Sequence, residues 1–76
     1  MKLVTIGIDD NTDGVNDCPK ILDDTDTDTD DGLIYVQGRR VTDSGALAQS
    51  MPGPGEVLCV VPRQAFLRAA RRVLGE

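Results

Sequence analysis

The sequence predicts an α+β domain, in which a small, mainly antiparallel sheet carries a short helix and a C-terminal helix packed on one face. Three features indicate this class. Short runs of β-forming residues alternate with turns rich in Gly, Asp and Pro. Two of these runs, residues 33–36 and 39–42, flank Gln37 and Gly38, and Gly38 can adopt the positive φ of a tight hairpin turn. Residues 62–74 repeat apolar side chains at helical spacing.

The size and charge of the chain limit what it can do. Its 76 residues predict a single domain, and a domain of this size buries only about 60% of the surface that its unfolded chain exposes. Its core is therefore marginal, and a partner subunit, a metal or a disulfide would stabilise it. Residues 1–31 carry ten Asp against two Lys, whereas residues 32–76 carry six Arg against three acids. The net charge of −5 disfavours non-specific binding to DNA.

The first half of the chain predicts two strands and two mobile acidic loops. Residues 2–8 alternate between two faces, as a strand does, and residues 9–16 contain turn formers without a core-forming run. Pro19 cannot donate to a sheet ladder, so we expect residues 18–22 to form a short edge strand. Residues 23–32 are acidic and of low complexity, and their mutual repulsion predicts a mobile loop.

The predicted hairpin leads directly into a short helix. Asp43 stands at the N-cap position of residues 44–50, where its carboxylate can accept from a backbone N–H of the first turn. Leu47 and Met51 lie four residues apart, so we expect both to contact the sheet from one face of this helix. The Pro-Gly-Pro-Gly sequence of residues 52–55 then ends the helix and turns the chain.

The last two predicted elements are a strand and a helix. Residues 56–61 contain an unbroken apolar run, which is typical of a central strand covered on both faces. The helix over residues 62–74 should pack on the sheet through one apolar stripe, formed by Phe66, Leu67, Ala70, Val73 and Leu74. Its opposite side should be basic, formed by Arg63, Arg68, Arg71 and Arg72.

The residues that usually carry catalysis are scarce. The sequence contains no histidine, which removes the usual general base and the commonest zinc ligand. Its two cysteines, Cys18 and Cys59, fit no redox or zinc motif. Residues 1–8 are too short for a secretory or membrane-spanning segment, so we expect a cytoplasmic protein with reduced thiols, without a membrane partner. We therefore expect a protein that is not an enzyme.

The acidic residues offer calcium as an alternative ligand. Oxygen ligands recur at alternate positions with a glycine in the sixth place, as in a calcium-binding loop, at Asp9, Asn11, Asp13 and Asp17. Lys20 occupies the twelfth position, where such a loop has a bidentate acid. The other interpretation of these residues is an acidic surface loop that binds divalent ions weakly.

A second pattern in the same region resembles a known calcium-binding unit. The sequence Asn-Asp-Cys-Pro at residues 16–19, followed by Asp24, Asp26 and Asp28, resembles a thrombospondin type 3 repeat over residues 9–32. The resemblance implies calcium coordination that includes Asp26 and Asp28. Such repeats occur in tandem with paired cysteines, whereas this chain has a single copy.

The predicted hairpin is the candidate contact surface for a protein partner or for self-association. Tyr35, Gln37, Arg39 and Arg40 would lie on it, and the two arginines could orient a partner's carboxylate or phosphate. The alternative is an ordinary hairpin with one face in solvent. The arginines of the last helix allow a further hypothesis, a nucleic-acid accessory, which the net charge disfavours.

From Cys18 onward, several short motifs follow one another in the order Cys18-Pro19, Ile21, Tyr35, Gln37-Gly38, Val41-Thr42-Asp43, Ala46-Leu47-Ala48, Gly55-Glu56, Val60 and Pro62. This order resembles a group of short, largely uncharacterised actinobacterial proteins associated with helix-turn-helix regulators. This chain differs from the group by its acidic segment at residues 23–31 and by its first strand with the loop that follows. The resemblance implies a small accessory protein that works by binding another protein, such as a regulator encoded nearby.

Overall fold

A computed structural model describes residues 1–9, 19–26 and 32–76 of the chain. In chain order, its elements are β1 (Leu3–Ile8), β2 (Lys20–Asp24), β3 (Ile34–Gln37), β4 (Arg39–Arg40), α1 (Ser44–Ser50), β5 (Cys59–Val60) and α2 (Arg63–Val73). In the described part of the chain, neither helix combines the length and the apolarity that a membrane crossing requires.

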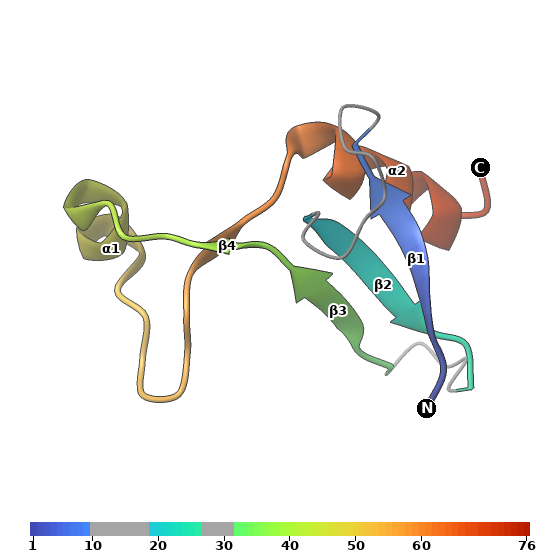
Figure 1. Cartoon of the computed structure of the whole chain (residues 1–76), viewed down its shortest axis with the longest axis horizontal. Helices are drawn as coiled ribbons and strands as arrows, with labels where there is room; N and C mark the ends of the chain where they lie inside the picture. The colour runs from blue at the N-terminus through green and yellow to red at the C-terminus, as the bar shows by residue number, and fades with distance from the viewer. Residues whose placement is uncertain (10–18, 27–31) are drawn as a thin grey trace.

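The elements form two parts, which we call the body and the arm (Figure 1). The body is an antiparallel sheet in the order β1-β2-β3, with α2 packed on one face. The arm comprises residues 39–60, in which β4 and β5 pair as a two-stranded ribbon and α1 lies at the far end from the body. The molecule is extended, since its radius of gyration is 13.6 Å, whereas a compact chain of this length has about 11.4 Å.

The body is held together by a close contact between small residues. A Cβ on Gly7 of β1 would collide with the backbone of Ala65 and would lie 2.7 Å from the Cβ of Ala69. Both alanines are buried, and Ile21, which pairs with Gly7 across the sheet, is also buried. These three are the buried hydrophobic residues of the described chain, so the core is small. The absence of a side chain at Gly7 is what allows α2 to lie against the sheet.

A hydrogen bond from an arginine also connects α2 to the end of β1. The guanidinium of Arg68 donates a hydrogen bond of 2.7 Å to the backbone oxygen of Ile8, in a partly buried position. A hydrogen bond from a charged group contributes about 1.5–3 kcal/mol, so Arg68 belongs to the packing of α2 and not to a solvated basic side.

Several predictions of the fold are confirmed. The chain has the α+β class, with a strand at Leu3–Ile8 where residues 2–8 were expected. The short helix spans Ser44–Ser50, as predicted for residues 44–50, and the C-terminal helix spans Arg63–Val73 within the predicted 62–74. Each of these elements depends on a local signal, namely alternation, an N-cap or helical spacing.

The predicted hairpin at Gln37 and Gly38 is wrong. The strand before these residues, β3, pairs with β2, and the strand after them, β4, pairs with β5 in the second sheet. Gly38 is not among the described glycines with positive φ. It is required for a different reason, because a Cβ there would lie 2.5 Å from the backbone oxygen of Val60.

The predicted positions of two strands in the sheet are also wrong. The strand after Pro19 is the central one, Lys20–Asp24, because it begins beyond the proline and every one of its residues can pair. Asp23 and Asp24 therefore belong to β2, although the acidic loop was expected to begin there. The run at residues 56–61 gives only the two-residue strand Cys59–Val60 in the arm, with Val60 exposed. Of the predicted loops, residues 10–16 and 27–31 lie outside the described residues.

The predicted apolar stripe of the last helix is only partly buried. Of its five residues, Leu67 and Ala70 are half-buried, whereas Phe66 is 58% exposed and Val73 and Leu74 are also exposed. The residues that face the sheet are Ala65 and Ala69, because only small side chains permit the close approach to β1. The expected contact of Leu47 and Met51 with the sheet is wrong as well, since α1 has no buried residue and Met51 is exposed.

Replacing Gly7 by Ala should destabilise the body by about 1–3 kcal/mol, because the added methyl group forces α2 away from β1. Urea unfolding followed by circular dichroism measures this free energy. Gly45→Ala is the control outside the body, since a Cβ there meets no backbone and only the Asp43 carboxylate oxygen, at 3.2 Å. Equal stability of the Gly7 variant and the wild type would refute the role assigned to this contact.

Candidate interaction surface

The arm lacks a core of its own. None of residues 39–60 is buried. Its ribbon consists of the pairs Arg39–Val60 and Arg40–Cys59, extended by one hydrogen bond of 3.0 Å from the Val41 N–H to the Leu58 oxygen. Such a short ribbon is marginal in isolation, so the arm is an element that gains stability from any surface that covers it.

Local hydrogen bonds define the helix of the arm. The carboxylate of Asp43 accepts a 2.9 Å hydrogen bond from the Ala46 N–H, and the Met51 N–H donates to the Leu47 oxygen at 2.9 Å. Met51 ends the helix in the left-handed region, with φ of 48°, a conformation that costs a non-glycine residue about 1–2 kcal/mol. Its side chain is 77% exposed, so a large apolar group stands in solvent on a strained backbone.

The turn after this helix is closed by Glu56. Its carboxylate accepts a 2.7 Å hydrogen bond from the Gly53 N–H, and its own N–H donates to the Gly53 oxygen at 3.0 Å. The turn brings the chain back beside α1 and leaves a hollow open to solvent. The hollow is lined by Arg40, Val41, Thr42, Leu47, Pro52, Glu56, Val57 and Leu58. It is an apolar surface that also holds one positive and one negative side chain.

The predicted contact residues do not gather at one place. Tyr35 is half-buried and Gln37 is exposed, and as alternate residues of β3 they share one face of the sheet. Arg39 and Arg40 are exposed neighbours in β4, so their side chains leave opposite faces of the ribbon and cannot clamp one group together. Arg40 alone lines the hollow of the arm.

An apolar surface on the body was not predicted. Val36 pairs with the buried Ile21, and Ile34 lies two residues before Val36, so both face the side of the sheet that carries α2. The helix packs on β1 and β2, and Val36 and Ile34 stay 49% and 46% exposed. The sequence signal was present, because β3 has no charged residue on either face.

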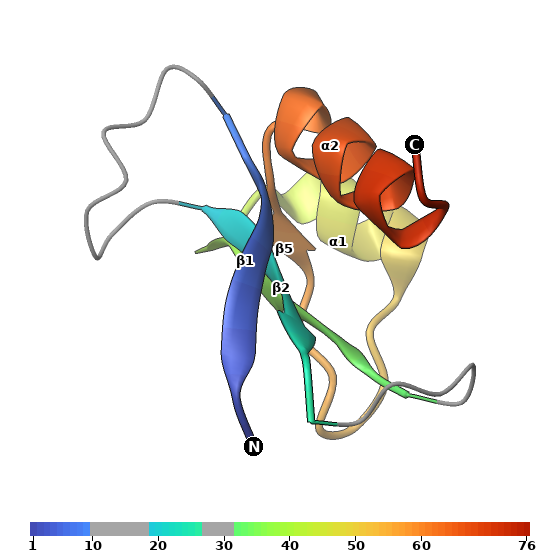
Figure 2. The same cartoon turned by 90° about the vertical axis from the view of Figure 1, so that its right-hand side faces the viewer.

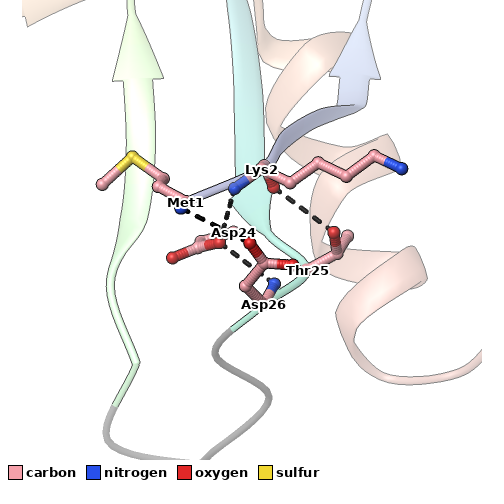
Figure 3. A network of polar contacts seen from close by, with 5 residues as sticks. All are labelled: Met1, Lys2, Asp24, Thr25 and Asp26. Carbon is pink, nitrogen blue, oxygen red and sulfur yellow. Dashed lines mark hydrogen bonds and ion pairs between the residues drawn. The ribbon is translucent and has the colours of Figure 1, made fainter.

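The acidic residues at the end of β2 and just after it make contacts within the chain (Figure 3). Asp24 accepts hydrogen bonds of 3.1 Å from the backbone N–H groups of Lys2 and Asp26, and the Asp26 carboxylate lies 3.4 Å from the Met1 ammonium. Residues 1–9, 19–26 and 32–76 contain no group of three or more acids or cysteines able to hold a metal ion. Asp9 lies at the end of the first described segment, and four predicted ligands lie outside the described residues: Asn11, Asp13, Asp17 and Asp28. Calcium binding stays a prediction.

Replacing Asp43 by Ala should unfold α1 without unfolding the body. The cap contributes about 0.5–2 kcal/mol, and α1 has no buried residue to compensate for its loss. Hydrogen exchange of the α1 amides should become faster, while the amides of β2 keep their protection. Asp43→Asn, which retains an acceptor oxygen, is the control and should exchange like the wild type. Equal protection of α1 in the alanine variant would contradict this account of the arm.

In comparisons with protein-family models, with curated proteins and with solved structures, no match to this chain was found.

Proposed function

We propose that this chain is a non-enzymatic protein-interaction module and that its arm, residues 39–60, is the element that binds a partner. The observation that carries the proposal is that no residue of the arm is buried. Folding gives the arm a defined backbone, with a capped helix, a ribbon and a closed turn, but no apolar core.

The energetics of the arm favour a partner. A helix of seven residues is far below the length at which an isolated helix is stable in water. The exposed side chains of Met51, Val57 and Val60 stay in contact with water. Fully burying one such side chain contributes about 1.5–3 kcal/mol, so a partner that covers two of them would offset much of the cost of ordering the arm.

The kind of partner is suggested by the sequence. The resemblance to short actinobacterial proteins associated with helix-turn-helix regulators supports a transcriptional regulator as the bound protein. A non-enzymatic role is supported by the lack of histidine in the whole sequence, which removes the usual catalytic base. The hollow of the arm, with Arg40 and Glu56 beside apolar side chains, would accept a partner surface of mixed character.

Affinity capture with purified, tagged chain from the source cell tests the proposal. The wild type should recover a defined protein, and Val57→Asp should bind that protein about ten- to hundred-fold more weakly, because Val57 is 62% exposed and lines the hollow. Gln49→Ser, an exposed polar change on the same arm, is the control and should bind like the wild type.

Circular dichroism should show that both variants keep the fold, since neither position is buried. Two outcomes count against the proposal: no protein recovered by the wild type, or a recovered protein that binds Val57→Asp and the wild type equally well.

A further inference from the structure

We infer that the hollow of the arm binds an extended peptide segment of the partner, in which an acidic residue lies two positions from a large apolar one. The inference rests on the proposed function and deepens it, because it names the chemistry that the arm recognises. Three features of the arm carry it: the shape of the hollow, the charge that remains available there and an acceptor oxygen at its centre.

The hollow continues into a second one along the arm. The first has a volume of about 320 Å³ and includes Arg40 in its lining, and the second has about 420 Å³ and includes Ser50. Four residues line both: Pro52, Glu56, Val57 and Leu58. The two hollows therefore form one depression, with Arg40 at one end and Ser50 at the other. An extended chain, whose alternate side chains point to one face, fits such a depression along its length.

The body of the chain leaves this depression open. The helix of the arm, α1, makes no extensive contact with any other described element. Figure 1 shows α1 and the turn after it beyond β3, and Figure 2 shows α1 on the same side of the sheet as α2. A peptide can therefore reach the hollow from solvent without displacing a part of the body.

The charge that remains available in the arm is positive. The carboxylate of Asp43 already accepts a hydrogen bond of 2.9 Å from the Ala46 N–H. The carboxylate of Glu56 accepts one of 2.7 Å from the Gly53 N–H. By contrast, neither arginine of the arm forms an ion pair with a described residue, and Arg40 lines the hollow. A guanidinium binds a carboxylate through two parallel hydrogen bonds, so an acidic side chain is its complement.

Glu56 limits where the acidic residue of the peptide can lie. It lines both hollows, so a second carboxylate in the middle of the depression would be repelled, and the acid is confined to the end at Arg40. Only one Glu56 oxygen, Oε1, accepts from Gly53, and the other can accept from a backbone N–H of the peptide. Val57, which is 62% exposed, offers an apolar contact in the same middle part.

These positions define the order of the peptide's side chains. Neighbouring side chains on one face of an extended chain are two positions apart. An acid that binds Arg40 therefore places an apolar residue over Val57 when a single residue separates the two. The depression recognises the pair, and the residue between them points away from it.

The same lining disfavours nucleic acid as the occupant. Among the described residues, none of those that line the two hollows is aromatic, whereas single-stranded nucleic acids are held by stacking of bases on aromatic rings. The net charge of −5 also opposes a polyanion, while a short peptide carries only one or two charges to the site.

Selection from a phage-displayed library of short random peptides on the full chain tests the inference. The enriched peptides should carry Asp or Glu two positions from Leu, Ile, Val, Met or Phe. By calorimetry, Arg40→Glu should bind a synthetic peptide of the enriched sequence at least about tenfold more weakly than the wild type. Arg39→Glu is the matched control, since the same charge change lies on the other face of the ribbon, and it should bind like the wild type.

Changes in the peptide keep the test decisive if Arg40→Glu disturbs the ribbon. Replacing the acid of the peptide by its amide should weaken binding to the unchanged wild-type chain at least about tenfold. Replacing it by Lys should abolish binding to the wild type and restore binding to Arg40→Glu. Peptides that bind equally well with and without their acid would overturn the inference.

Three further results would also overturn it. They are a library without an enriched acidic and apolar pair, equal weakening by Arg40→Glu and Arg39→Glu, and Arg40-dependent binding of a single-stranded oligonucleotide in place of any peptide. The proposed function has a separate criterion, namely a captured protein whose binding depends on Val57. If that protein binds Arg40→Glu as well as it binds the wild type, the proposed function stands without the acidic peptide.

Discussion

The fold depends on the contact between the backbone of β1 at Gly7 and the two small residues of α2, Ala65 and Ala69. Because a helix can lie this close to a strand only where both surfaces are small, the contact fixes which side of the helix faces the sheet. Phe66 and Val73 of α2 are then exposed while Leu67 is half-buried, and the described core is reduced to three buried hydrophobic residues. A chain that uses its smallest residues for its own packing leaves several of its larger ones exposed.

Local signals in the sequence were sufficient for part of this structure. Alternation predicted the first strand, the N-cap Asp43 predicted α1, and helical spacing predicted α2. The failures concern packing between distant segments. Gly38 suggested a hairpin, but its small size is needed because the chain passes close to the backbone of Val60. The strand β4 pairs with β5, whose residues lie about twenty positions further along the chain. The side of α2 that faces the sheet was predicted from hydrophobicity alone, without the steric fit of the helix to Gly7.

Of the residues that line the hollow of the arm, only Arg40 was predicted as a contact residue. Arg40 was named and lines the hollow of the arm, whereas Arg39 lies on the other face of the ribbon. Val57 and Leu58 were assigned to a buried central strand, since an unbroken apolar run does not show whether a sheet exists to cover it. The exposure of Val36 could not be predicted either, because it depends on how far α2 extends across the sheet.

The close contact at Gly38 also has a mechanical consequence. The arm is connected to the body by two chain segments, residues 37–39 and 60–62, which pass so close together that a Cβ on Gly38 would lie 2.5 Å from the Val60 oxygen and 3.0 Å from the Val61 side chain. Two closely packed connections restrict the directions that the arm can take relative to the body. If the arm binds a partner as proposed, this restriction lowers the orientational entropy lost on association, compared with an arm joined by one flexible segment.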